Sequence, residues 1–219
     1  MRAPFIVLLP VVALLAAGCV TSRSGDPRET EAEKYLLSAS QKQRSGDKVG
    51  ALRDLDQAIR VYPDNPQALV RRGALRAELK DVPGATEDFD RVIEINPNYP
   101  TAYFGRGVMR QQLKQHDLAI EDFTHCMQLN PSLAEAYLRR GLSYAEKNDF
   151  RKAIADFGEA VRIDPNQYRG YLWRAYAFNA LRESDRAMAD FCYVRDHAKE
   201  EALVRSARYW IDRLTAKPR

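Results

Sequence analysis

Two similar segments between residues 103 and 165 decide the fold. YFGRGVMRQQLKQHDLAIEDFTHCMQLNP (103–131) is followed by YLRRGLSYAEKNDFRKAIADFGEAVRIDP (137–165). At an offset of 34 residues, Gly107 aligns with Gly141 and Phe123 with Phe157. A constant period of this length predicts an array of repeated supersecondary units rather than one globular core.

The same period extends in both directions and defines five windows: 32–65, 66–99, 100–133, 134–167 and 168–201. Each window contains two amphipathic helical patterns separated by a short polar turn. Prolines stop the second helix of the first four windows, at Pro63, Pro97, Pro131 and Pro165. We therefore predict an all-α solenoid of five helix–turn–helix units. Residues 202–219 are predicted to be a capping helix (Ala202–Leu214) and a tail, because a terminal repeat needs a cap with a polar outer face.

Small and large residues recur at fixed places in the windows. Glycine stands inside the first helix of the three central windows, where it costs about 1 kcal/mol relative to alanine, so another helix must approach closely there. Small residues opposite it are Ala51, Ala85, Ala119, Ala153 and Ala187. The joint between units is filled by Leu55, Phe89, Phe123, Phe157 and Phe191.

Spacing and residue types together resemble the tetratricopeptide repeat (TPR) over residues 32–201, including the early aromatic residue at Tyr35, Tyr103, Tyr137 and Tyr171. The resemblance implies a protein- or peptide-binding module whose first helices line a groove. The positions carried over to the groove are Leu36, Val70, Phe104, Val108, Leu138, Leu142, Leu172 and Tyr176. Such an apolar trough favours an amphipathic helix or a hydrophobic strand. The alternative is that these residues are core between the repeats.

Every window has an aspartate just before its large joint residue, and an arginine stands eighteen residues after each aspartate. The first window has Ser38 at the arginine position. We predict ion pairs from each unit to the next that fix the register of the stack, in preference to an anion-binding row. The predicted pairs are Asp54–Arg72, Asp88–Arg106, Asp122–Arg140, Asp156–Arg174 and Asp190–Arg208.

Residues 1–18 have the layout of a signal peptide, with a positive charge at Arg2, an apolar run and then small residues. The end of this segment, Leu15-Ala16-Ala17-Gly18-Cys19, resembles the bacterial lipobox, although the motif usually has leucine where Ala16 stands. The resemblance implies cleavage before Cys19 and its lipidation, with Val20 favouring the outer membrane, facing the periplasm. The alternative is an ordinary secreted protein cut after Gly18. Residues 19–31 are predicted to be the lipidated cysteine and a flexible tether.

The sequence gives little support for nucleic-acid binding, metal binding or catalysis. The formal net charge of +4 comes from charges that alternate in sign along the helices, so no basic face indicates nucleic-acid binding. His116, His125 and His197 lack metal-ligand spacing, and Cys126 stands where other windows have alanine or valine. We find no phosphate loop or nucleophile constellation. We predict no enzymatic activity, metal, cofactor or small-molecule substrate.

The combined prediction is a membrane-anchored TPR scaffold or adaptor lipoprotein of the bacterial envelope. It would bind a protein or peptide partner during the assembly or regulation of an envelope complex. Similar lipoproteins act as pilotins or as adaptors of hydrolases and proteases, and the sequence does not choose between them. Two alternatives remain: a periplasmic carrier or chaperone that shields hydrophobic segments of exported proteins, and an enzyme with an unrecognised site.

Overall fold

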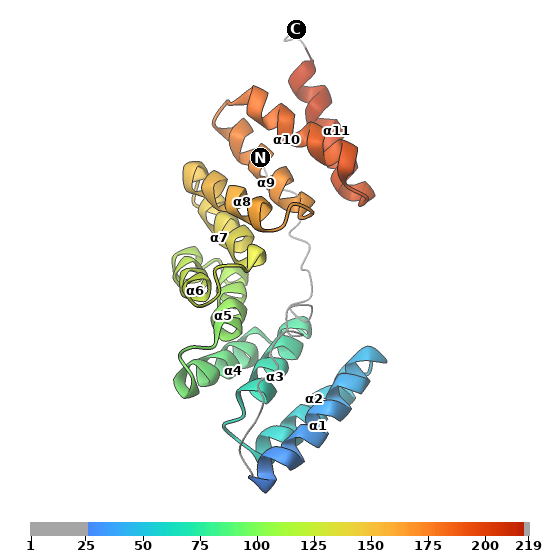
Figure 1. Cartoon of the computed structure of the whole chain (residues 1–219), viewed down its shortest axis with the longest axis vertical. Helices are drawn as coiled ribbons and strands as arrows, with labels where there is room; N and C mark the ends of the chain where they lie inside the picture. Colours follow the sequence, from blue (N-terminus) through green and yellow to red (C-terminus); the bar gives the residue numbers. More distant parts are fainter. Residues whose placement is uncertain (1–25, 217–219) are drawn as a thin grey trace. The chain divides into compact units, whose positions relative to one another are not determined.

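The computed structural model describes residues 26–216, and this part of the chain forms helices and connecting turns without any β-strand. The predicted leader (1–18), Cys19 and residues 20–25 lie outside the described residues. The helices of the described part are α1 (Pro27–Arg44), α2 (Lys48–Val61), α3 (Pro66–Glu78), α4 (Val82–Ile95), α5 (Pro100–Gln112), α6 (His116–Leu129), α7 (Ala134–Glu146), α8 (Phe150–Ile163), α9 (Tyr168–Ala180), α10 (Ser184–His197) and α11 (Glu201–Thr215) (Figure 1). The predicted all-α fold class is confirmed. Across residues 26–216, no helix combines the length and the apolar character that crossing a membrane requires.

The chain divides into two compact units, one up to Met109 and the other from Arg110 onwards, so that the division falls within α5. In unit 1, α1 packs against α2, α2 against α3 and α3 against α4 (Figure 1). In unit 2, each helix from α6 to α11 packs against the next. Contacts between neighbours in sequence are typical of a repeat array, because each hairpin buries its apolar face against the adjacent hairpin.

The first helix starts earlier than predicted. Residues 27–31 were assigned to the flexible tether, but they form the first turns of α1. The Asp26 side chain caps this helix by accepting a hydrogen bond from the backbone N–H of Arg28 at 2.9 Å. Pro27 stands at a first-turn position, where its missing N–H costs nothing. The tether prediction is therefore wrong for residues 27–31, because capping signals outweigh polar composition.

The turn that follows each first helix contains a residue with left-handed backbone geometry. The φ values are +84° at Gly46, +69° at Lys80, +60° at Lys114, +62° at Asn148 and +63° at Arg182. At the second turn, Lys80 N–H donates to Ala77 O (3.1 Å) and Asp81 N–H donates to Arg76 O (2.9 Å). These bonds satisfy the last carbonyl groups of the helix and reverse the chain into the second helix. Only the first turn uses the residue type that adopts this geometry without a steric penalty.

The predicted packing residues form the core. Leu55, Phe89, Phe123, Phe157 and Phe191 are 0% exposed, as are the five alanines opposite them. Gly141 in α7 shows why a small residue is needed on the first helix. A methyl group on Gly141 would lie 2.7 Å from Cε1 of Phe157 and 3.2 Å from Cβ of Asp156. The two helices of this hairpin therefore approach as closely as the Phe157 ring allows.

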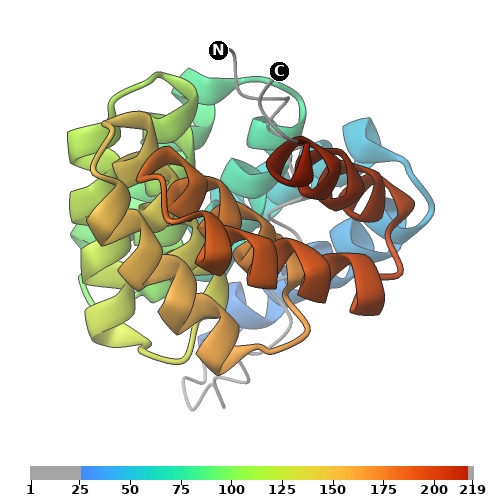
Figure 2. The same ribbon diagram turned by 90° about the horizontal axis from the view of Figure 1, so that it is seen from above.

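Helix α11 covers the end of the stack in unit 2. Ala207 is buried, and the Trp210 ring lies parallel to Phe191 with ring centroids 6.1 Å apart. Arg205 and Arg208 on the other side of the helix are exposed. Figure 2 shows α11, in dark red, alongside α10. An apolar inner side and a charged outer side are the properties that a terminal cap requires.

The close approach at Gly141 leads to a paired stability prediction. We expect Gly141→Ala to lower the free energy of unfolding by about 1–3 kcal/mol, because overpacking outweighs the gain of about 1 kcal/mol in helix propensity. Gly158→Ala in α8 is the matched control, since the nearest neighbouring atom to its added methyl group is Arg174 Nη1 at 3.8 Å. This control should gain up to about 1 kcal/mol. Urea denaturation measures both effects, and equal changes would contradict the packing argument.

Candidate functional site

Most of the predicted groove residues lie in the interior. Leu36 is 4% exposed and packs with Leu55 and Leu75, while Leu138 is 0% exposed and packs with Phe157. Val70, Phe104, Val108 and Leu172 are also buried. Only Leu142 and Tyr176 of the eight keep part of their surface exposed. The assignment of the six buried residues to a groove is corrected here: they are core, because their side of each first helix packs against other helices.

Polar side chains one turn away join one first helix to the next. In unit 1, Arg71 Nη1 donates to Ser40 Oγ at 2.6 Å and to the Leu36 carbonyl at 3.3 Å, which ties α3 to α1. In unit 2, Gln111 Nε2 donates to the Arg139 carbonyl and to Ser143 Oγ, both at 2.8 Å. These bonds satisfy half-buried polar groups and fix the spacing of the first helices within each unit.

A charged cluster lies where α7 and α9 follow each other in unit 2; we call Glu135, Arg139, Gln167 and Arg169 the Glu135 cluster. Glu135 Oε1 accepts from Arg139 Nε at 2.8 Å, and its Oε2 accepts from Gln167 Nε2 at 3.0 Å. The Arg139 side chain is only 6% exposed. Glu135 binds Arg139, and Glu200 is a second negative charge that acts on Arg169, so the formal charges of the two guanidinium groups are balanced.

Two atoms of this cluster are unsatisfied. Arg169 Nη1 and Gln167 Oε1 are both buried without a hydrogen-bond partner among residues 26–216. Burial lowers the pKa of Arg169; the charges of Glu135 and Glu200 oppose this shift and the charge of Arg139 adds to it. A buried N–H group without an acceptor is unfavourable. The cluster can therefore accept a carboxylate or carbonyl oxygen from another molecule.

Apolar side chains continue the same surface. Trp173 and Tyr176 follow Arg169 at the spacing that keeps residues on one side of a helix. Their rings meet edge to face with centroids 5.4 Å apart, and Tyr176 Oη lies 2.5 Å from Ser206 Oγ. We define the first-helix surface of unit 2 as Glu135, Arg139, Leu142, Arg169, Trp173 and Tyr176. It combines half-buried apolar side chains with a guanidinium nitrogen that has no acceptor among residues 26–216.

The ion-pair ladder exists, but its predicted pairing is wrong. Arg140 Nε and Nη2 donate to the two oxygens of Asp156 at 2.8 and 2.7 Å, and Arg174 binds Asp190 in the same way, with both bonds at 2.8 Å. Arg72, Arg140 and Arg174 thus pair with the aspartate of their own hairpin, because the first and second helices face each other there. The five predicted pairs are replaced as follows: Asp54 pairs with Lys42, Asp88 with Arg72 and Arg76, Asp122 with Arg110, Asp156 with Arg140, and Asp190 with Arg174, while Arg106 pairs with Asp90 and Arg208 is exposed.

The third nitrogen of the guanidinium reaches the preceding hairpin. Arg72 Nη1 lies 2.8 Å from Asp56, and Arg106 Nη1 lies 2.7 Å from Asp90. Arg140 Nη1 donates to Thr124 Oγ1 at 3.0 Å. At the next seam the corresponding residue is Gly158, which has no side chain to offer Arg174. The arginines therefore do join successive hairpins, but through residues two positions beyond the predicted aspartates.

Cys126 and the possible metal ligands give no sign of a reactive centre. Cys126 is 0% exposed. Burial, with a smaller contribution from the charge of Asp122, raises the pKa of the Cys126 thiol to about 12. The reactive thiolate is therefore scarce at neutral pH. Within residues 26–216, no group of three or more His, Cys, Asp or Glu side chains is placed to hold a metal ion.

Comparison with known sequences now places the chain. Profiles described as tetratricopeptide repeat match residues 36–100, 100–133 and 134–167, and the last two coincide with the third and fourth predicted windows. The chain belongs to the tetratricopeptide repeat family. The predicted membership is confirmed. Comparison with curated proteins produced no match.

Solved structures agree with this TPR assignment. MamA (residue 41 to the end) from Desulfovibrio magneticus RS-1 has a TM-score of 0.71 at 25% identity, covering 79% of this chain and 96% of that one. TTC0263, a thermophilic TPR protein from Thermus thermophilus, has a TM-score of 0.66 at 22% identity, covering 82% and 99%. YrrB, described as a TPR protein with an unusual peptide-binding site, has a TM-score of 0.66 at 16% identity, covering 85% and 100%. These likenesses establish the TPR solenoid fold.

Sequence reasoning missed the Glu135 cluster, although one signal was present. Glu135 and Arg169 occupy the same place in successive windows, 34 residues apart, with opposite charge. Their proximity depends on how first helices follow each other in the stack. The repeat pattern also does not specify side-chain geometry, and it is this geometry that leaves one nitrogen of the Arg169 guanidinium without a partner among residues 26–216.

The corrected ladder predicts which aspartate is energetically coupled to Arg140. Arg140→Ala and Asp156→Ala should each lower stability, and the double variant should lose less than the sum by about 1–3 kcal/mol, because each single change leaves a half-buried charge alone. Arg140→Ala combined with Asp190→Ala serves as the control and should be additive, because Asp190 pairs with Arg174. Urea denaturation supplies the four free energies of each cycle. Additive losses for Arg140 and Asp156 would rule out the pairing.

Proposed function

We propose that this TPR protein is a membrane-anchored scaffold that holds a protein or peptide partner during the assembly or regulation of a bacterial envelope complex. Its fold suits protein–protein interaction, and TPR proteins are typically non-catalytic scaffolds. The observation that carries the proposal is the first-helix surface of unit 2, where Arg169 Nη1 is buried without an acceptor among residues 26–216. The description of YrrB as a TPR protein with a peptide-binding site also supports a peptide partner.

The chemistry of the surface defines the partner. A carboxylate on the partner would supply the acceptor that Arg169 Nη1 lacks, in a charge-assisted hydrogen bond. Apolar side chains of the same segment would pack against Leu142, Trp173 and Tyr176. The partner we propose is therefore an amphipathic segment with an acidic residue next to its apolar side.

The anchor rests on the sequence of the leader. Apolar residues from Phe5 to Ala17 and the segment Leu15–Cys19 support lipidation of Cys19. Acyl chains contribute about 0.8 kcal/mol for each methylene group buried in the bilayer, so several chains hold a protein on its membrane. Confinement to that surface would raise the local concentration of the bound partner there. We place the protein at the outer membrane, facing the periplasm, on the basis of Val20.

Lipidation predicts a change in fractionation. Cys19→Ser should move the protein from the membrane fraction to the soluble fraction and abolish labelling by an alkyne-tagged fatty acid. Cys192→Ser is the matched control, because that half-buried cysteine lies in α10 and should leave both readouts unchanged. Cell fractionation with immunoblotting measures the effect. Membrane retention of Cys19→Ser would refute the anchor.

Photo-crosslinking in cells tests the binding surface. A photoreactive residue in place of Leu142 or Tyr176 should capture one discrete protein, whereas the same residue at Arg151, exposed on the second helix α8, should not. Arg169→Ala should weaken capture by about tenfold or more, because the charge-assisted hydrogen bond is lost, and Arg169→Lys should have an intermediate effect. Capture of many different exported proteins would indicate a carrier or chaperone rather than a scaffold. Equal capture from Arg151 would show that this surface is not the binding site.

A further inference from the structure

The first hairpin differs from the other four at one place in the repeat pattern. Arginine occupies this place in the later hairpins, as Arg72, Arg106, Arg140 and Arg174, whereas α1 has Ser38. In the described part of the chain no helix precedes α1, so no side chain from a preceding hairpin reaches this place either. The difference matters because the rest of the arginine site is retained.

The later hairpins show what a guanidinium group contacts at this place. It donates two hydrogen bonds to an aspartate of the second helix, as Arg140 does to Asp156 and Arg174 to Asp190. In two of the later hairpins it also lies over the tyrosine three residues earlier: Cζ is 5.3 Å from the ring centroid of Tyr171 for Arg174 and 5.7 Å from that of Tyr103 for Arg106. A carboxylate at one side and an aromatic face at the other form a complete environment for a guanidinium ion.

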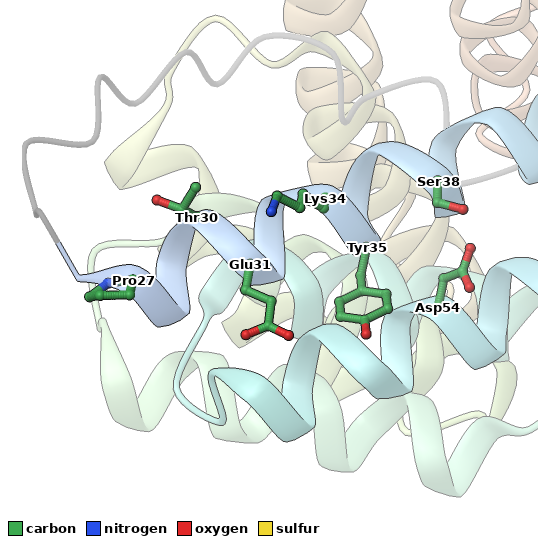
Figure 3. A pocket seen from close by; sticks show the side chains of 7 residues that line it. All are labelled: Pro27, Thr30, Glu31, Lys34, Tyr35, Ser38 and Asp54. Atoms are coloured by element: carbon green, nitrogen blue, oxygen red, sulfur yellow. The ribbon is translucent and has the colours of Figure 1, made fainter.

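The first hairpin keeps both of these groups without the arginine. Asp54 corresponds to the aspartate and Tyr35 to the tyrosine. They line an open hollow of about 810 Å³ together with Ser38, Glu31 and Lys34. Figure 3 shows Glu31 and Tyr35 extending from α1 toward α2, while Asp54 points from α2 toward Ser38. The Asp54 side chain is 14% exposed, the highest value in the aspartate row, whose other members range from 1% for Asp122 to 10% for Asp190.

Lys42 does not take the place of the missing arginine. It lies one turn beyond Ser38, at the position of Arg76 in the second hairpin. Its Nζ forms an ion pair with Asp54 Oδ2 at 2.7 Å. Burial raises the pKa of Asp54, but hydrogen bonds from Lys42 and Ser38 outweigh this effect and lower that pKa. In the second hairpin one carboxylate serves both cations, since Asp88 accepts from Arg72 and Arg76 at 2.7 and 3.0 Å. Asp54 can therefore bind a second cation while Lys42 stays in place.

We propose that the hollow beside Asp54 and Tyr35 is a binding site for the guanidinium group of an arginine side chain presented by another protein. Asp54 accepts the paired hydrogen bonds and the Tyr35 ring lies against the cation, while the opposite charges of Glu31 and Lys34 offset each other in the rest of the lining. Arginine is favoured over lysine because its planar group makes two parallel bonds to one carboxylate and stacks on an aromatic ring. The site is in unit 1, so it does not depend on the membrane anchor or on the first-helix surface of unit 2.

The test uses Nα-acetyl-arginine amide as the probe, titrated into the detergent-solubilised full-length protein. Binding is followed from the backbone amide resonances of Tyr35, Ser38 and Asp54. We expect saturable shifts in the millimolar range, typical of a single small cation. Nα-acetyl-lysine amide should bind more weakly, and the uncharged Nα-acetyl-citrulline amide should cause no saturable shift.

Substitutions in the hollow make the test specific. In Ser38→Arg the new guanidinium group should fill the hollow. The variant should therefore show no probe-induced resonance shifts and should have a higher melting temperature than the unchanged protein. Gln41→Arg, which adds the same charge at an exposed position of α1, should leave probe binding unchanged. Asp54→Asn should weaken binding by about tenfold or more, because the charge of the acceptor is lost. Tyr35→Leu introduces the residue type that the second hairpin has at Leu69. This variant should weaken probe binding less than Asp54→Asn does.

Two results would overturn the proposal. One is an unchanged titration in both Asp54→Asn and Ser38→Arg, which would place the probe elsewhere. The other is equal binding of the arginine and citrulline probes, which would remove the role of charge. If Ser38→Arg does not fold, as judged by circular dichroism, Asp54→Asn and Tyr35→Leu decide the question alone. Loss of the arginine site would not change the expected capture by the first-helix surface of unit 2, so the two proposals are tested independently.

Discussion

The close packing of two helices within each hairpin is the constraint on which the rest of this structure depends. Gly141 leaves room for the Phe157 ring, and only at that separation do Arg140 and Asp156 come within hydrogen-bond distance. The same separation gives the left-handed residue of each turn its position. Packing, ion pairs and turn geometry are therefore not independent features of the repeat. A change at the small residue would disturb all of them together, because interiors at this density have little room to adjust.

The arginine and aspartate rows have a consequence for how the stack is held together. Arg72 and Arg140 each use two nitrogens inside their own hairpin and direct the third to the preceding one, so a single side chain stabilises both the hairpin and its seam. A planar group with five N–H donors can do this, whereas a lysine cannot. The hairpin with serine at this place has the most exposed aspartate of the five, although the difference is small: 14% for Asp54 against 10% for Asp190. What sets Asp54 apart is the absence of an arginine beside it, which is a departure from the repeat rather than a dedicated motif.

Sequence reasoning succeeded where a feature repeats and failed where it depends on geometry between helices. The 34-residue period and the prolines at 63, 97, 131 and 165 indicated the helix pairs, because they express local preferences. The groove prediction failed for residues such as Leu138, because apolar residues at helical spacing do not reveal which side of the helix is covered. The ladder was assigned to the wrong partners because sequence spacing cannot distinguish an aspartate of the same hairpin from one of the preceding hairpin. Left-handed Lys80 and Arg182 carried no signal, since neither is a residue type that favours this geometry.

The residues that receive the third arginine nitrogen differ between the two units. In unit 1 they are Asp56 and Asp90, with side chains 37% and 46% exposed, whereas in unit 2 they are the neutral Thr124 and then Gly158. Attraction between charges that are open to water is screened by dissolved ions, while a neutral hydrogen bond and apolar contact are not. Outside the arginine row, unit 2 has an exposed ion pair across one seam, between Lys147 and Asp117. Within the arginine row, ionic strength acts unequally: the contacts to Asp56 and Asp90 weaken as salt rises, whereas the hydrogen bond to Thr124 does not.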